Sequence, residues 1–338
     1  MSSLLSRLKQ KSMIKAWIII AILLISLSLF SLMYGEITLN LNTLWNVFTG
    51  NASAPHQLLV EKIRLPRLLA ALLIGAALAL SGLILQIITK NPLASPDVFG
   101  ISDSAVLALA FTILLSSSSM LGQWWQALMG AIFCVFFILI ASGGVGTQGY
   151  RILVIGVGIA TLMKASFDLI LATLPVMHTS NILIFSSGSL IGRSYSILLP
   201  TSIFIMLLVS IIVLWRRLFS AMVLPDSVID SLGEPLSKIR LMLIIIAAFL
   251  AGTAVSIAGP IGFVAIAAPI IAFKSFPHHL FPIFPTMCIG ASMVLSADLL
   301  GKNLLAPVEI PAGIISGMVG GPLLLWLLYR HSRSMSRT

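Results

Sequence analysis

The feature that most constrains this chain is a series of apolar runs long enough to cross a lipid bilayer. A helix needs about 20 apolar residues to cross the hydrocarbon core. Runs of about this length, with 103–116 and 261–273 as shorter candidates, follow one another along the sequence: 16–34, 68–88, 121–141, 152–173, 198–215, 241–258, 280–300 and 312–329. They predict an all-α polytopic membrane protein with about ten transmembrane helices.

Composition supports a chain that lies mostly within the bilayer. Hydrophobic residues make up 59% of the sequence and charged residues only 9%, whereas a soluble domain carries about 25% charged residues. A net charge of +10 would suggest nucleic-acid binding in a soluble protein. Here the basic residues fall mainly in short loops, where they determine orientation. We therefore expect a single membrane domain over residues 1–338, in contact with membrane lipid and without a nucleic-acid partner.

The distribution of Lys and Arg predicts the orientation, because short cytoplasmic loops collect basic residues. If the N-terminus is cytoplasmic, the inner segments hold most of the 20 Lys and Arg. These inner residues are Arg7, Lys9, Lys11, Lys15, Lys90, Arg151, Arg216, Arg217, Lys238, Arg240, Lys274, Arg330, Arg333 and Arg337. Both termini are therefore predicted to be cytoplasmic, with an inner tail 1–15, an inner loop 216–240 and an inner tail 330–338.

A few basic residues fall on the outer side and depart from this pattern. Lys62, Arg64 and Arg67 surround Pro66, just before the run 68–88, and Lys302 follows the run 280–300. Charges that depart from the pattern at one place suggest an anionic partner outside the membrane. The outer segments Gly35–Arg67 and Thr173–Tyr195 are also too long for simple turns, so each is predicted to hold a short helix.

Several kinds of chemistry are excluded by missing motifs. The sequence has no GxxxxGK[ST] motif, so the chain is not expected to bind ATP through a P-loop or to act as an enzyme on its own. Cys134 and Cys288 lie in apolar runs without CxxC spacing, and no histidine forms a metal-ligand pattern. We expect no catalytic residue, no metal and no cofactor.

Two pairs of ionisable residues have helical i, i+4 spacing inside or beside apolar runs. Lys164 and Asp168 are predicted to neutralise each other, and a role in a proton or ion pathway is the alternative. That alternative would make the chain an ion-coupled secondary transporter. Asp298 and Lys302 are interpreted as a local ion pair, as part of an outward-facing basic surface, or as both.

The inner loop contains a predicted short helix. Val228, Ile229 and Leu232 form an apolar stripe, acidic residues lie alongside, and Gly233 is a natural helix stop. Such a helix needs a groove on a partner protein. The alternative, a helix lying on the inner membrane surface, is disfavoured because acidic residues are repelled by the anionic leaflet. The residues assigned to this helix are Ser227, Val228, Asp230, Ser231, Leu232, Gly233 and Glu234.

Two turns rich in proline and glycine separate the predicted helices. The first contains Asn91, Pro92 and Pro96; the second contains Gly259, Pro260 and Gly262. Proline fixes an extended conformation before it and stops helices, and glycine permits close backbone approach. Broken helices of this kind are common in transporters, so both turns are predicted to form loops or gates.

These motifs, taken together and in order, resemble the FecCD-type, or type II, permeases of ABC importers for iron chelates and cobalamin. The resemblance covers roughly residues 36 to 330. It rests on Arg64-Leu65-Pro66-Arg67; Gly75–Ala79 with Ser81-Gly82 and Gln86; Asn91–Asp97 with Gly100; Gly188-Ser189-Leu190; Leu232-Gly233; Gly259–Val264; Ala297-Asp298; Pro311-Ala312-Gly313; and Gly320-Gly321-Pro322.

The resemblance implies ten spanning helices and a pore made with a second permease subunit, either identical or a related paralogue. It also implies two cytoplasmic ATPase subunits and a periplasmic binding protein that delivers the chelate across a bacterial inner membrane, with a siderophore as the favoured cargo. By the family pattern, Arg64, Arg67 and Lys302 would dock acidic residues of the binding protein. The segment Ser227–Glu234 would be the coupling helix that contacts the ATPase.

The chain departs from the family pattern at three places. Lys302 stands where arginine is usual, which replaces a bidentate contact with a point charge. Pro235 follows the coupling segment closely and would shorten its helix. After Gly259–Phe263 the family often has Pro-His and a following arginine, whereas this chain has Ala268-Pro269-Ile270-Ile271 with Lys274. These changes affect expected contacts and leave the expected fold unaltered.

Overall fold

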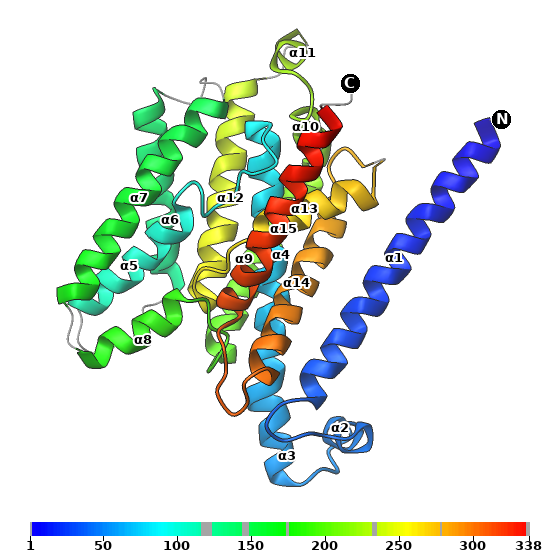
Figure 1. Ribbon diagram of the computed structural model, residues 1–338, viewed down its shortest axis with the longest axis vertical. Helices are drawn as coiled ribbons and strands as arrows, with labels where there is room; N and C mark the ends of the chain where they lie inside the picture. Colours follow the sequence, from blue (N-terminus) through cyan, green and yellow to red (C-terminus); the bar gives the residue numbers. More distant parts are fainter. Residues whose placement is uncertain are drawn as a thin grey trace.

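The computed structural model describes residues 2–115, 124–143, 149–173, 176–231, 235–277 and 279–335. Throughout this part of the chain the regular structure is helical (Figure 1). The helices are α1 (Ser2–Met33), α2 (Leu41–Phe48), α3 (Ala54–Leu58), a π-helical segment η1 (Leu59–Arg64), α4 (Leu65–Thr89), α5 (Ile101–Leu115), α6 (Trp124–Ser142), α7 (Gly149–Thr173), α8 (Val176–Ser186), α9 (Tyr195–Leu214), α10 (Arg216–Ala221), α11 (Asp226–Ser231), α12 (Leu236–Ala258), α13 (Val264–Ser275), α14 (Ile283–Asn303) and α15 (Ala312–Met335).

Within the described residues, seven helical stretches are long and apolar enough to cross a membrane. They comprise most of α1, the continuous stretch from α3 to α4, and α6, α7, α9, α12 and α14. Parts of α5, α13 and α15 form three shorter apolar helices. Each predicted run thus corresponds to a helix, although residues 116 and 121–123 of two predicted runs lie outside the described residues. The number and direction of crossings stay predictions.

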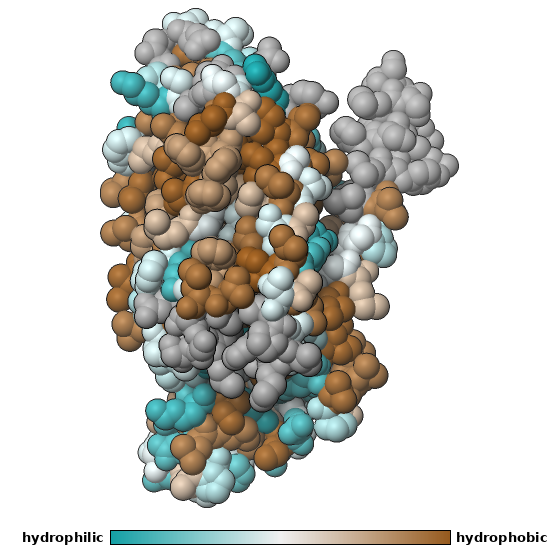
Figure 2. Space-filling model, turned by 90° about the vertical axis from the view of Figure 1, so that its left-hand side faces the viewer, coloured by the Kyte–Doolittle hydropathy of each residue, from teal (hydrophilic) through white to brown (hydrophobic). Residues whose placement is uncertain are grey.

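The surface has the distribution of polarity that a bilayer requires. Hydrophilic residues gather mainly toward the two ends of the molecule, and apolar side chains dominate the band between them (Figure 2). The N-terminal end of α1, the C-terminal end of α15 and the short helix α11 lie at one end, and α2 and α3 lie at the other (Figure 1). This arrangement agrees with the prediction that both termini and the inner loop share one side.

Helix α4 forms the centre of the bundle. The candidate span that contains it is 78% buried, whereas the span in α1 is 17% buried. Helices α12, α13 and α14 pack against α4. Small residues permit this packing: a Cβ added at Gly75 would lie 2.4 Å from the carbonyl oxygen of Gly290. In a membrane, close packing of small residues is a main source of helix association.

Both predicted outer helices are present. Helix α2 is amphipathic: Leu44 and Val47 are buried, while Trp45 and Phe48 are exposed. Helix α8 occupies the outer segment between α7 and α9. Helix α1 diverges from the bundle toward its N-terminal end and packs mainly on α14 (Figure 1). These elements place two clusters of charged residues, one at each end of α4.

Candidate functional site

The structure brings Arg64, Arg67 and Lys302, the three residues predicted to dock a binding protein, into one cluster around the end of α1. Gly35 marks its centre: a Cβ there would lie 2.4 Å from Lys302 Cε and 3.3 Å from Arg64 Nη2. The side chains come from η1, from the first turn of α4 and from the last turn of α14. We call Arg64, Arg67 and Lys302, with their acidic partners Asp298 and Glu309, the outer charge cluster.

Arg64 lies against the C-terminal end of α1. Its Nη1 donates hydrogen bonds to the carbonyl oxygens of Leu32, at 2.6 Å, and Met33, at 3.0 Å, and its Nη2 donates to that of Ile37. The last carbonyls of a helix have no intrahelical donor and carry partial negative charge. A guanidinium is suited to satisfy several of them at once, so Arg64 anchors the end of α1 to the start of α4.

Arg67 bridges two carboxylates that are far away in the sequence. Its Nε and Nη2 donate to Asp298, with Nη2 2.8 Å from Oδ1, and its Nη1 donates to Glu309 Oε2 at 2.7 Å. The contact with Asp298 is the bidentate geometry that makes arginine–carboxylate pairs strong. Asp298 is almost fully buried, with 2% of its surface exposed, so this pair fixes α4 against α14.

Lys302 completes the cluster by donating from Nζ to the carbonyl oxygen of Tyr34 at 2.6 Å. A local ion pair with Asp298 was one of the interpretations that the sequence left open for Lys302, beside an outward-facing basic surface. In the structure Asp298 bonds to Arg67, and Lys302 bonds to the residue after α1. The i, i+4 spacing does place Asp298 and Lys302 on one face of α14. Arg67 of α4, however, bonds to Asp298 in the stronger bidentate geometry.

The cluster is buried in the isolated chain. Arg64 is 4% exposed, and Arg67 and Lys302 are each 9% exposed. Their donors are directed at acceptors of the same chain, which shows a role in holding α1, α4 and α14 together. Three cations face two carboxylates, so one positive charge is left in excess. Docking of a binding protein to these residues stays a prediction. The neighbouring outer basic residue Lys62 is exposed and lies outside the cluster's hydrogen bonds.

A second set of ion pairs ties the inner short helix to the bundle. Asp226, the first residue of α11, accepts from Lys90 Nζ at 2.5 Å and from Arg240 Nη2 at 3.1 Å. Lys90 is the left-handed C-cap of α4, with φ of 52°, and Arg240 lies in the first part of α12. The first residue of α11 is therefore bonded to the ends of two central helices.

The pKa of Asp226 reflects these bonds. Burial alone would raise it, but hydrogen bonds and charge interactions with Lys90 and Arg240 outweigh burial and hold the pKa below its usual range. The carboxylate is therefore ionised at neutral pH. The stability that these ion pairs contribute to the folded chain is fully present above the ordinary pKa of aspartate. It is lost only as the pH falls through the lowered pKa of Asp226.

The predicted coupling helix is present in part. Helix α11 contains Ser227, Val228, Asp230 and Ser231, with Ile229 buried and Val228 exposed. Leu232, Gly233 and Glu234, with the helix stop predicted at Gly233, lie outside the described residues. The apolar stripe is therefore divided: Ile229 packs inward, and Val228 remains on the surface.

The second predicted turn, at Gly259 and Pro260, lies against the backbone at the end of α8 and at the start of α15. Gly259 has φ of +79°, and a Cβ there would lie 1.9 Å from the carbonyl oxygen of Phe185. The amide of Gly313 donates to the carbonyl oxygen of Gly188 at 3.0 Å. A Cβ on Gly188 would lie 2.4 Å from the carbonyl oxygen of Pro260. Three segments therefore meet through their backbones, which explains the small residues.

The linker of Asn91, Pro92 and Pro96 continues toward this junction. The side chain of Asn91 accepts a hydrogen bond from the amide of Leu93, while Pro96 is buried. The adjacent Asp97 carboxylate lies 3.7 Å from the position a Cβ on Gly262 would take. The two turns predicted separately are thus neighbours. Their role as gates stays a prediction.

Arg193 is a charged residue of this region whose place the sequence did not indicate. It is 8% exposed, and its guanidinium lies 5.6 Å from the centroid of the Phe185 ring. Burial lowers its pKa to about 10, so the group remains charged at neutral pH. A cation–π contact with Phe185 therefore holds the loop after α8.

The ion pair predicted between Lys164 and Asp168 on α7 is not among those that the described residues form. Lys164 and Asp168 are exposed on α7, and the ion pairs found among the described residues do not include them. Both instead interact electrostatically with Asp103 on α5. Asp103 attracts Lys164 and repels Asp168, so side chains one helical turn apart need not meet when another carboxylate competes for the lysine.

Sequence reasoning also missed Glu309 as a partner of Arg67 and Asp226 as the bridge between Lys90 and Arg240. One signal could have identified them: the whole chain has only ten Asp and Glu. A carboxylate in such a chain costs free energy unless it is paired or solvated, so each one is a candidate partner for a misplaced cation.

Replacing Arg64 by alanine tests the anchoring of α1. The change would remove the donor to the buried carbonyl of Leu32, at about 1–3 kcal/mol, whereas the carbonyl of Met33 would keep the amide of Leu39 as a donor. We expect faster amide hydrogen exchange over residues 30–40 and a lower temperature of unfolding in detergent. Lys62→Ala, at a neighbouring exposed position, should change neither. Unchanged exchange in Arg64→Ala would show that the arginine does not hold this end of α1.

Comparison with known proteins adds independent information. The sequence profile of the FecCD transport family matches residues 22–330. The chain is 32% identical to the Fe(3+)-citrate import system permease protein YfmE of Bacillus subtilis (strain 168), over 96% of this chain and 98% of that protein. It is 33% identical to the hemin transport system permease protein HmuU of Yersinia pestis, over 93% and 95% of the two chains.

A third relative is the ferric enterobactin transport system permease protein FepG of Escherichia coli (strain K12), 30% identical over 88% of this chain and 91% of that protein.

The fold also resembles a solved inward-facing structure of a transporter described as metal-chelate type ABC. The TM-score is 0.82 with 24% identity, covering 92% of this chain and 97% of the other. These findings contradict the alternative of an ion-coupled secondary transporter that uses Lys164 and Asp168.

Proposed function

Because this chain belongs to the FecCD transport family, we propose that it is the membrane permease of an ATP-driven importer that carries an iron(III) chelate into the cell. The similarity to permeases over nearly the whole chain carries this proposal. The relatives are named for citrate, haem and enterobactin systems, so iron in chelated form is the shared cargo. A siderophore is the cargo we favour within that class.

ATP hydrolysis is assigned to other subunits. The chain lacks a P-loop, and importers of this family work with a separate ATPase and a substrate-binding protein. We propose two ATPase subunits on the inner side, where α11 lies between the ends of α4 and α12. The exposed Val228 offers an apolar contact for an ATPase groove. Asp226, bonded to Lys90 and Arg240, would transmit movement of α11 to the central helices.

A second permease subunit would complete the pore. Lys164 and Asp168 are exposed on α7, a candidate membrane span. Ionisable residues inside spans almost always face protein or a water-filled cavity rather than lipid. This face of α7 is therefore expected to border the second subunit or the aqueous route between two subunits. An identical chain and a related paralogue both fit this requirement.

The substrate-binding protein is proposed to dock on the outer side, over the outer charge cluster. The excess of one positive charge favours acidic groups on the partner. All three basic residues are already bonded within the chain. Carboxylates of the partner would therefore compete with Asp298 and Glu309 for Arg67. Glu309, at 25% side-chain exposure, is the competitor nearest to solvent.

Reconstitution tests the proposed function directly. The chain, its cognate ATPase and its binding protein in proteoliposomes should take up a ferric chelate only with ATP, and the loaded binding protein should stimulate hydrolysis. Ionophores that collapse proton and sodium gradients should leave uptake unchanged. Uptake without ATP that disappears with the ionophores, or hydrolysis that never responds to the loaded binding protein, would contradict an ATP-driven importer.

Replacing Glu309 by glutamine tests docking without removing a buried cation. The change raises the excess positive charge at the cluster, so association of the binding protein should become several-fold faster at low salt and lose this advantage at high salt. Glu61→Gln, on the neighbouring η1 segment, is the matched control for a general charge effect. Equal association rates for wild type and Glu309→Gln at every salt concentration would place docking elsewhere.

A further inference from the structure

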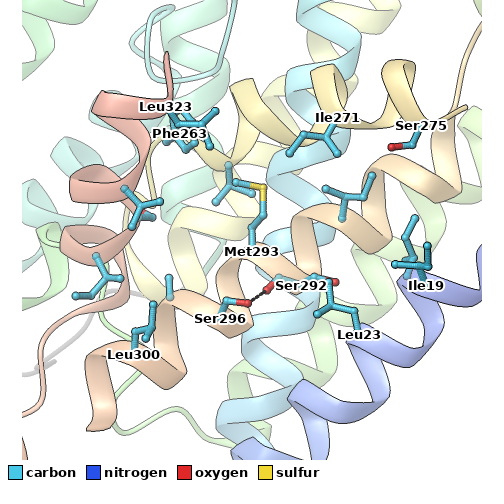
Figure 3. A pocket seen from close by; sticks show the side chains of 17 residues that line it. Ile19, Leu23, Phe263, Ile271, Ser275, Ser292, Met293, Ser296, Leu300 and Leu323 are labelled. Atoms are coloured by element: carbon cyan, nitrogen blue, oxygen red, sulfur yellow. Dashed lines mark hydrogen bonds between the residues drawn. The ribbon is translucent and has the colours of Figure 1, made fainter. Parts of the chain in front are cut away.

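A cleft separates α1 from the C-terminal helices on the side of α14 that faces away from α4. It encloses about 420 Å³, which is within the usual range of ligand pockets, about 300–1,000 Å³. Side chains of α1 line one side, α15 lines the other, and α14 lies between them (Figure 3). Ile19 and Leu23 lie at one side, Met293 near the middle and Leu323 at the opposite side (Figure 3).

The lining of this cleft is mostly apolar, and three of its four serines have hydroxyls that bond to their own helix, while the fourth, Ser275, is next to Lys274 on α13. The hydroxyls of Ser292, Ser296 and Ser316 each donate to a backbone carbonyl of their own helix, at 2.7–2.9 Å. They therefore offer little to a polar ligand. A polar chelate or a column of water would find few hydrogen-bond partners here, whereas a hydrocarbon chain would lose nothing by entering.

The depth of the cleft suits one leaflet of a bilayer. Its lining on α14 extends from Ile289 to Leu300, which is about 16 Å at 1.5 Å rise per residue. The hydrocarbon core is about 30 Å thick, so the cleft accommodates a chain that descends through about half of it. The candidate span of α1 is only 17% buried, so lipid can reach the cleft alongside this helix.

Charge and aromatic residues at one end of the cleft favour a particular headgroup. Trp17 and Phe276 pack with ring centroids 5.3 Å apart, and tryptophan is enriched at membrane interfaces. Lys15 and Lys274, both exposed, each lie two residues before this contact on α1 and α13. No described carboxylate forms an ion pair with either lysine. The end nearest the N-terminus therefore presents two cations at headgroup level.

We propose that this cleft binds a glycerophospholipid with an anionic headgroup. One acyl chain lies between α1 and α15 over α14, and the phosphate group lies between Lys15 and Lys274. The lipid fills the space that separates α1 from the bundle. Its phosphate group connects α1 to α13 by binding a lysine of each helix. With the N-terminus on the cytoplasmic side, the lipid belongs to the inner leaflet. This assignment does not depend on the transported cargo.

Each lysine near an anionic membrane surface contributes enough for about a fivefold change in affinity. Native mass spectrometry of the full chain in detergent can count retained lipids. Dioleoyl phosphatidylglycerol should bind more than tenfold better than dioleoyl phosphatidylcholine, which has the same acyl chains. The double variant Lys15→Gln/Lys274→Gln should bind both lipids equally, and Lys238→Gln, at an exposed position on α12, should keep the preference.

A cleft-filling variant tests the acyl chain separately. Ser296→Phe replaces a side chain whose hydroxyl bonds only to its own helix, and it should lose retention of both lipids. Equal retention of the two lipids by wild type, or a preference that survives in the double lysine variant, would overturn the proposal. A lipid-free dimer that Ser296→Phe dissociates would also overturn it, because a second copy would then occupy the cleft.

Discussion

The close contact between α4 and α14 is the constraint on which the rest of the structure depends. In a bilayer, association of helices relies on packing rather than on exclusion of water, and the approach of Gly75 to Gly290 allows it. The same two helices carry Arg67 and Asp298, whose bidentate bond joins them at the outer end. Helix positions fixed in this way bring Lys302 to the end of α1.

Charged groups bond to neighbouring elements at both ends of α4. At the outer end, Arg64 and Arg67 start the helix and are bonded to α1, α14 and Glu309. At the inner end, Lys90 caps the helix and is bonded to Asp226 of α11. A movement of α11 would therefore act on the same helix that bears the outer charge cluster, and it would give the proposed importer a short connection between its two proposed partners.

Much of this architecture could be predicted from the sequence, because spans are determined by apolar length and orientation by loop charge. Helices α2, α8 and α11 were predicted where they occur, and Arg64, Arg67 and Lys302 were grouped through the family resemblance. The pairing was not predictable. Asp298 bonds to Arg67 instead of Lys302, and Lys164 does not close on Asp168, because local spacing says nothing about a competing charge that tertiary packing brings from another helix.

We propose that Asp226 transmits the work of ATP hydrolysis from α11 to α4 and α12. The most direct test compares wild type with Asp226→Asn in reconstituted complexes and measures chelate uptake per ATP hydrolysed. Asparagine keeps the size of the side chain but removes the charge that holds Lys90 and Arg240. The account predicts continued hydrolysis with a several-fold lower uptake per ATP. An unchanged ratio of uptake to hydrolysis would contradict it.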